Sequence, residues 1–378
     1  IPPRGCGDAL QPLRGRIAAY FLTPLLLFLL VLPVAGRTAT LPTWSLAPWQ
    51  SPDGVGLAVP GIAPMQSETS PATISVGIPI DIAGDGRPEV FFCHGTHAQY
   101  PPEEQPCRFI ELGEDGSVED RSFALLGPEL PGSIGAREIT VADFNSDGQP
   151  DIFVGNTGID ADPFPGERNV LLVSLPDGTY ENRSASLPDV PDFTHSTTAA
   201  DLEGDGDIDI MVGNLGLVVD PAKTYLLIND GDGNFVQDTS RLPATLADRE
   251  EFYPDFLLVD ANGDGFPDLF MGTWMPCCPS AILLNDGSGS FANLPRIELP
   301  PGPLGAGNEN VQDAVAMMLN DDSFPDLVVL TTIQPDYVGT GVQALVSNGD
   351  GTFRDETAAR FGANAARFAG DFDADGVT

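Results

Sequence analysis

Short apolar runs rich in Val, Ile, Leu and Phe recur through residues 71–378, and each is bounded by Gly, Pro, Asn or Asp. Runs of this kind are typical of short buried strands, whereas an amphipathic helix would space its apolar residues three or four apart. One stretch has candidate strands at 137–143, 151–156, 169–175 and 179–185. The 42 Gly and 36 Pro residues add many turn positions, so we predict short strands and few long helices.

The strands belong to an internal repeat. Copies of one acidic motif begin, at nearly constant spacing, at Asp81, Asp143, Asp201, Asp260, Met318 and Asp371. The three intact copies are DFNSDGQPD, DLEGDGDID and DANGDGFPD, while the copy at Met318 is degraded and the copy at Asp371 is cut short. A Gly- and Asp-rich turn between two further strands, as in LLINDGDGNF (226–235), follows each of the first five copies and predicts a β-hairpin.

Each repeat therefore holds four short strands, which is the content of one propeller blade. We predict an all-β fold, a β-propeller over residues 71–378 with five complete blades and a truncated sixth. Propellers usually close a ring of four to eight blades. Residues 37–70 are accordingly interpreted as a linker or as a strand that closes the ring, and we expect the chain to continue beyond Thr378.

The N-terminus indicates export. An apolar run at 17–34 follows Arg14 and Arg16, and the small residues Ala35 and Gly36 come after it. This order is typical of a signal peptide, which we assign to residues 1–36; an uncleaved membrane anchor is the alternative. Either way, we expect the remainder to be secreted, periplasmic or at the cell surface.

Cysteine spacing fits an exported chain. Cys93 and Cys107 bracket a Pro-rich loop and are the natural disulfide pair. Cys277 and Cys278 are adjacent, so they form either a vicinal disulfide or two thiols.

The net charge excludes some partners. With 17 Lys and Arg against 55 Asp and Glu, the formal charge is −38. Such a chain has no basic stripe for a nucleic-acid backbone and no basic patch for an anionic lipid surface. We expect neither partner.

The acidic motif has the pattern D-x-[DNE]-x-D-G-x-x-D, which predicts a cation site. Oxygen-bearing side chains at positions 1, 3, 5 and 9 can converge if the backbone curls tightly, and Gly at position 6 permits that curl. Hard oxygen ligands in a flexible loop favour Ca²⁺ over Mg²⁺. An EF-hand is excluded because position 12 is apolar and lies in a β-rich run. The alternative is a set of surface turns, in which Asp, Asn and Gly are common anyway.

The expected ligands of the three intact copies are Asp143, Asn145, Asp147, Asp151, Asp201, Glu203, Asp205, Asp209, Asp260, Asn262, Asp264 and Asp268. Those of the weaker first copy and the truncated last copy are Asp81, Asp85, Glu89, Asp371, Asp373 and Asp375. The copy at Met318 has lost its first ligand and has Ser323 in place of Gly, so we expect it to bind no metal.

These blade-like units, with their acidic loops and NDGDGNF-type hairpins, resemble the FG-GAP/VCBS repeats, bacterial relatives of the integrin α-subunit propeller. The resemblance covers roughly residues 71–378. It implies a seven-bladed ring, one Ca²⁺ loop between the first two strands of many blades, a structural role for the metal, and partners that bind loops on one face. Residues 71–378 depart from what the resemblance implies in their incomplete blade count, and we expect no appended catalytic domain within them.

Three functions are compatible with these features. We favour an exported calcium-binding module for adhesion to, or binding of, an extracellular protein or glycan. The alternatives are a polysaccharide lyase or hydrolase and a cell-surface assembly element. No catalytic residue is assigned: His94 and His97 form an H-x-x-H pair in a solvated loop, and we expect His195 to be structural. The loop of Trp274 is our candidate for a partner contact.

Overall fold

The computed structural model describes residues 74–82, 89–95, 104–113, 117–159, 164–215, 223–247, 251–274, 278–305, 309–333 and 338–362. These residues form an all-β structure with five four-stranded antiparallel sheets and one two-stranded sheet. The predicted signal segment (1–36), the segment 37–70 and the motif copy at Asp371 lie outside the described residues. Within the described ranges, no helix is both long enough and apolar enough to cross a membrane.

The sheets follow one another along the chain. The first two consist of β1 (Ile74–Ile80), β2 (Glu89–Gly95), β4 (Arg108–Leu112) and β5 (Val118–Asp120), then β7 (Ala136–Ala142), β8 (Asp151–Asn156), β9 (Val170–Ser174) and β10 (Tyr180–Asn182). The third and fourth consist of β11 (Thr194–Ala200), β12 (Asp209–Asn214), β13 (Tyr225–Asn229) and β14 (Phe235–Asp238), then β15 (Asp255–Val259), β16 (Asp268–Gly272), β17 (Ala281–Leu283) and β18 (Arg296–Glu298). The fifth consists of β19 (Glu309–Met317), β20 (Asp326–Ile333), β21 (Val338–Ser347) and β22 (Phe353–Asp355), and β3 (Gln105–Pro106) pairs with β6 (Gly132–Ser133).

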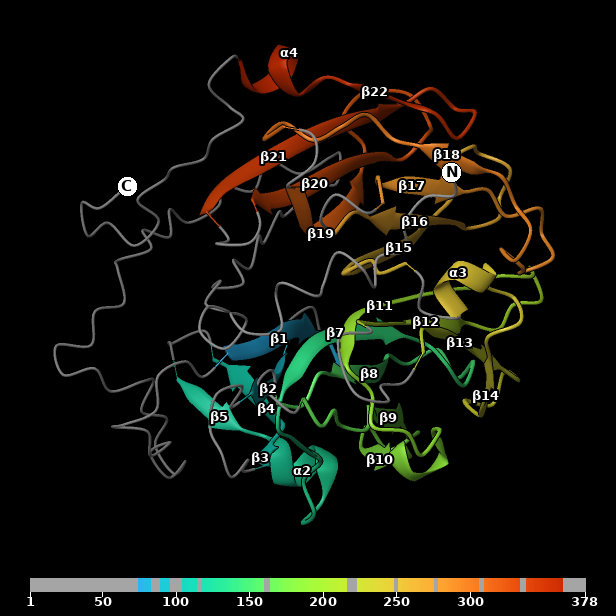
Figure 1. Ribbon diagram of the computed structural model, residues 1–378. Coiled ribbons are helices and arrows are strands. Elements are labelled where there is room, and N and C mark those ends of the chain that lie inside the picture. Colours follow the sequence, from blue (N-terminus) through green and yellow to red (C-terminus); the bar gives the residue numbers. More distant parts are fainter. Residues whose placement is uncertain are drawn as a thin grey trace, which may run out of the picture.

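The first strands of the five sheets lie next to one another. β7 contacts β1 and β11, β15 contacts β11 and β19, and the sheets fan outward from this inner set (Figure 1). Side chains join neighbouring first strands: the hydroxyls of Thr140 and Thr197 lie 2.6 Å apart, and Ser196 Oγ accepts a hydrogen bond from Phe256 N (3.0 Å). This succession of four-stranded sheets is consistent with a β-propeller.

The apolar runs of the sequence become strands that are covered on both faces. Every residue of β8, β12 and β16 is buried, because each sheet packs against a sheet on either side. Phe144, Phe153, Ile210 and Leu227, for example, share one core cluster between the second and third sheets. Continuous apolar runs, rather than strict alternation, are what such strands require.

The strand predictions at 137–143, 151–156 and 169–175 are confirmed within a residue or so of each end. Short helices at the ends of three sheets were not predicted: α2 (Ser122–Leu126) after β5, α3 (Ala244–Ala247) after β14 and α4 (Thr357–Phe361) after β22. A short 3₁₀ turn, η2 (Ser184–Ser186), follows β10. None of these has room for an amphipathic repeat, so periodicity could not reveal them.

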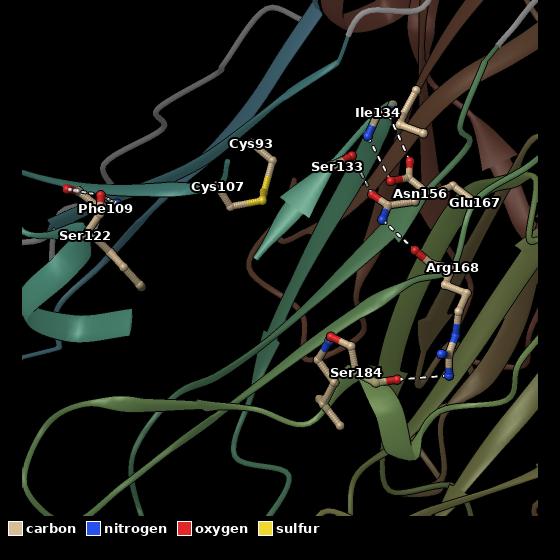
Figure 2. The surroundings of a disulfide bond; sticks show 12 residues. Cys93, Cys107, Phe109, Ser122, Ser133, Ile134, Asn156, Glu167, Arg168 and Ser184 are labelled. Atoms are coloured by element: carbon tan, nitrogen blue, oxygen red, sulfur yellow. Dashed lines mark hydrogen bonds between the residues drawn. A yellow bond between two sulfur atoms is a disulfide. The ribbon is translucent and has the colours of Figure 1, made fainter. Parts of the chain in front are cut away.

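The predicted Cys93–Cys107 disulfide is confirmed. It joins Cys93 in β2 to Cys107, which lies between β3 and β4. Near it, just before β7, Glu167 accepts hydrogen bonds from the amides of Ile134 (2.8 Å) and Gly135 (3.0 Å) (Figure 2). Cys278 is buried. Cys277 lies outside the described residues, so the vicinal disulfide between the two stays a prediction.

Candidate functional site: acidic loops and an inner recess

The three intact acidic motifs form loops between the first and second strands of the second, third and fourth sheets. In each loop the position 1 Asp accepts the amide of the position 6 Gly: Gly148 to Asp143 (2.7 Å), Gly206 to Asp201 (2.9 Å) and Gly265 to Asp260 (2.9 Å). These three glycines have φ of 83°, 98° and 92°, which side chains other than Gly rarely adopt. The tight curl predicted from the motif is therefore present in all three loops.

The side chains at positions 3 and 5 contact each other in two of these loops. Asn262 Nδ2 donates to Asp264 Oδ2 (2.8 Å), and Asn145 Nδ2 donates to Asp147 Oδ2 (3.0 Å). These loops present amide and carboxylate oxygens to solvent within a single turn of chain.

The loop of the third sheet differs because Glu203 stands at position 3. Glu203 Oε1 accepts a hydrogen bond from Arg241 (2.8 Å), while Oε2 is buried and has no hydrogen-bond partner among the described residues. Burial and the neighbouring Glu203 carboxylate raise the pKa of Asp209 to about 7. Two carboxylates in contact, one with an unpaired buried oxygen, form a place where a cation would be stabilised.

Position 9 has a second role. Asp268 is buried and accepts hydrogen bonds from Ala261 N at position 2 (2.9 Å) and from Asn285 N at the end of the third strand (2.8 Å). Asp151 and Asp209 make the same two contacts in their sheets. So does Asp326 in the fifth sheet, whose loop has lost its first ligand. Position 9 therefore ties the acidic loop to the third strand of the same sheet.

The loops are also tied to the following sheet. Asn229 Nδ2 donates to Phe144 O (2.7 Å), Asn285 Nδ2 to Leu202 O (2.8 Å) and Ser347 Oγ to Ala261 O (3.1 Å). In each case a residue at the start of one hairpin turn reaches position 2 of the preceding acidic loop. The loops thus lie at the junctions between sheets, where a bound cation would affect the stability of both.

The donor set suits a hard cation in chemical type, but the carboxylates do not converge on one point. Among the described residues, no group of three or more His, Cys, Asp or Glu side chains is arranged to hold a metal. The reason is visible at position 9, where both oxygens of Asp151 face backbone amides rather than the loop's open side.

The remaining predicted ligands are less fully described. In the first copy Glu89 is buried and accepts Ile82 N (3.1 Å), which repeats the position 9 contact, and Asp81 is exposed. Asp85, Asp371, Asp373 and Asp375 lie outside the described residues. His94 lies in β2, and His97 is outside the described residues.

A second acidic feature occupies the first strands. The residue five positions before each acidic loop is Glu138, Ser196, Asp255 or Asp313 in sheets two to five; we call these four residues the inner row. Glu138 accepts Thr197 N (2.7 Å), and Ser196 Oγ lies 3.3 Å from Asp255 Oδ1. Burial raises the pKa of Glu138 to about 8 and that of Asp255 well above its usual range, and repulsion from Asp313 adds to both. The three carboxyl groups are therefore close enough to influence one another.

β-Bulges occur beside the inner row. The register shifts at Arg137 in β7, His195 in β11 and Gln312 in β19, so each of these residues lacks a cross-strand partner position. All three line one small recess, of ≈ 10 Å³, which we call the inner recess; it is completed by Leu215, Pro254, Trp274, Asn310 and Val311. A bulge at the same place in three sheets turns an extra side chain toward this point.

The structure bears on two sequence interpretations here. His195 lies within β11, with its ring 4.9 Å from that of Phe193 and Nδ1 3.3 Å from Phe193 O, and it lines the recess. Trp274 is only 6% exposed, so its loop does not present it as a surface aromatic. The inner row was missed, although a polar residue at one repeat position of an otherwise apolar strand could have revealed it.

Neither a protein-family model nor a curated protein sequence matches the chain. Among solved structures, it is similar to an exo-β-1,3-galactanase from Bifidobacterium bifidum s17, with 11% identity, a TM-score of 0.38, and coverage of 73% of this chain and 90% of that one. A second, from Clostridium thermocellum, shows 11% identity and a TM-score of 0.37 over 71% of this chain and 59% of that one. Similarity at this level establishes neither common descent nor common chemistry.

Proposed function

We propose that this chain is an exported, calcium-stabilised β-propeller that binds an extracellular ligand, with carbohydrate as the favoured class. The observation that carries the calcium part is the Glu203 carboxylate, packed against Asp209 with one buried oxygen unpaired. The tight curl of the loops that begin at Asp143 and Asp260 also supports calcium binding. A protein ligand remains the alternative partner.

Calcium would act as a structural ion at the junctions between sheets. A ligand that binds only the folded state stabilises it by mass action, and sites of the extracellular kind have dissociation constants as weak as about 10⁻⁴–10⁻³ M. At about 10 mM calcium, each filled site would then contribute roughly 1–3 kcal/mol. The seven-bladed ring and the closing role of residues 37–70 remain part of this proposal.

The test compares thermal melting in calcium and in EGTA for two matched variants. Asp264→Asn alters position 5 of an intact loop, and Asp322→Asn alters position 5 of the degraded loop. Both carboxylates are exposed and accept the amide two residues ahead, from Phe266 (2.9 Å) and Phe324 (3.0 Å). We expect calcium to raise the melting temperature of the wild type and of Asp322→Asn, and to raise that of Asp264→Asn less. An equal response of all three proteins to calcium, or no response, would overturn the calcium role.

A second candidate function is polysaccharide cleavage, which the raised pKa values of the Glu138 and Asp255 carboxyl groups favour. A carboxyl group that stays protonated near neutral pH can donate a proton to a leaving oxygen. The test is incubation of the full chain with polysaccharides, followed by measurement of reducing ends and of unsaturated products. Turnover that is lost in Glu138→Gln would support an enzyme; binding without turnover would support a binding module.

A further inference from the structure

We propose that the inner recess and the inner row together form a binding site for a neutral, hydroxyl-rich ligand, which we identify as a sugar at the end of a polysaccharide chain. This inference deepens the ligand-binding part of the proposed function and is independent of the calcium loops. It rests on unpaired buried acceptors, on the bulges that place side chains around them, and on the protonation expected of the inner carboxyl groups.

The unpaired acceptors come first. Asp255 Oδ2 and Asn310 Oδ1 have no hydrogen-bond partner among the described residues, and the two residues are only 6% and 3% exposed. They belong to neighbouring first strands, β15 and β19, and Asn310 lines the recess directly. An unpaired buried acceptor costs about 1–3 kcal/mol, so a ligand that brings hydrogen-bond donors to this point is stabilised there.

The bulges show that residues from several sheets contribute to the inner recess in a repeated way, so the recess is not an accidental gap between sheets. Arg137, His195 and Gln312 come from the second, third and fifth sheets, and each is the extra residue of a bulge at the same repeat position. Arg137 supplies donors, Gln312 supplies both donors and acceptors, and Trp274 supplies an apolar surface. This mixture suits a ligand that is polar at its edge and apolar on its face.

The chemistry of the inner row favours a neutral ligand over a cation. Burial opposes ionisation of Glu138 and Asp255, and Asp313 opposes it further, while Arg137 acts in the other direction on Glu138. A protonated carboxyl group donates one hydrogen bond and accepts others, as a hydroxyl group does, so it pairs well with hydroxyls. A divalent cation needs ionised ligands, and burial opposes ionisation of both Glu138 and Asp255.

The size of the recess restricts how the ligand binds. A space of ≈ 10 Å³ holds about one water molecule, so it admits a single hydroxyl or hydroxymethyl group and not a whole sugar ring. The ring itself would remain outside, and we infer that it would meet Glu138 and Asp313, which directly follow the lining residues Arg137 and Gln312 and are partly exposed and exposed. This is why we expect recognition of a chain end rather than of a buried internal segment.

The test uses the full chain and short neutral oligosaccharides of glucose, galactose, xylose and mannose, with binding measured by calorimetry and by ligand-observed NMR. We expect at least one of the four sugars to bind. Asp255→Asn should weaken that binding about tenfold or more, because a carboxyl O–H both donates and accepts hydrogen bonds, whereas the NH₂ group that replaces it only donates them. Asp313→Asn should also weaken sugar binding. Because Asp313 is exposed, this substitution is less prone to disturb folding than Asp255→Asn. Glu119→Gln, at an exposed residue of β5, is the control and should bind as the wild type does.

Several outcomes would overturn the inference. One is that none of the four sugars binds; another is that binding is the same in Asp255→Asn, Asp313→Asn and wild type. A third is that calcium, manganese or spermidine binds and that Asp255→Asn abolishes this binding, which would make the place a cation site. Melting in EGTA separates the two proposals. If calcium has no effect on stability but Asp255→Asn still loses sugar binding, the calcium role fails and the inner site stands.

Discussion

The carboxylate at position 9 is predicted to hold each sheet together whether or not its loop binds a cation. The fifth sheet isolates this effect, because its loop lacks the first ligand and the glycine. Asp326 is fully buried; Oδ2 accepts Leu319 N (2.7 Å) and Oδ1 accepts Ser347 N (2.9 Å). Asp326→Asn replaces one of these acceptors with a donor, so one buried N–H group loses its partner and faces an NH₂ group.

The cost follows from that count. Leaving one buried N–H group unsatisfied costs about 1–3 kcal/mol. At roughly 2–4 °C per kcal/mol, the value for domains of 150–250 residues, the melting temperature should fall by about 2–12 °C. Thermal melting and urea unfolding, each followed by circular dichroism, would measure the loss. Asp321→Asn removes the same charge from an exposed position of the same loop and should stay within about 0.5 kcal/mol of wild type.

Asp268→Asn extends the comparison to an intact loop. In EGTA it should lose about as much stability as Asp326→Asn, because Asp268 makes the same two contacts. In calcium it should also lose part of the stabilisation that the ion provides. The reasoning is refuted if Asp326→Asn and Asp321→Asn have the same melting temperature. It is also refuted if Asp268→Asn in EGTA has the melting temperature of the wild type.

Three further predictions concern the junction between sheets, the disulfide and pH. Asn285→Ala removes the side-chain donor of Leu202 O and should lower the free energy of unfolding in urea by about 1–3 kcal/mol, because that contact joins two sheets. Replacing both Cys93 and Cys107 by Ala opens a crosslink with a sequence separation of 14, and should cost about 3 kcal/mol in the same assay. Burial raises the pKa of Glu167 from 4.5 to about 7, so its contribution to stability is full below pH 4.5 and is lost as pH rises through 7. Glu167→Gln should flatten that part of the pH profile.

Each of these has a matched control. Asn348→Ala, at an exposed hairpin position, should leave unfolding unchanged within about 0.5 kcal/mol. Reduction of the wild type should reproduce the effect of the double cysteine variant, and a reduced wild type that remains as stable as the oxidised one would contradict it. For pH, the difference in the free energy of unfolding between wild type and Asn348→Ala, a variant without a titratable side chain at the substituted position, should have about zero slope between pH 5 and 8. A Glu167→Gln profile parallel to wild type would show that Glu167 does not titrate in this range.

Much of the fold follows from local pattern. The alternation of apolar runs with Gly- and Asp-rich turns predicts the strands, because turn residues such as Gly148 and Gly206 adopt backbone angles closed to other residues. The 14-residue separation of Cys93 and Cys107 predicts their disulfide, because the Pro-rich segment between them is a short connection between neighbouring strands. These features depend on residues close together along the chain.

The inner site could not be predicted in the same way. Arg137 lines the recess because a bulge in β7 inserts it between Ala136 and Glu138, and a strictly alternating strand pattern does not predict such a bulge. Glu138, Asp255 and Asp313 approach one another only because the first strands of different sheets lie side by side. The second role of position 9 was hidden for a related reason, since its partner Asn285 N lies just after the third strand, β17, and not in the loop.

Calcium binding by the loops is the central claim, and counting bound ions tests it most directly. Chain stripped with EGTA would be dialysed to equilibrium against labelled calcium up to millimolar concentrations, alongside the triple variant Asp147→Asn, Asp205→Asn, Asp264→Asn. We predict that the wild type binds at least three more calcium ions per chain than the triple variant, one for each intact loop. Equal numbers of ions bound to the two proteins, or no binding to the wild type at millimolar calcium, would contradict the account.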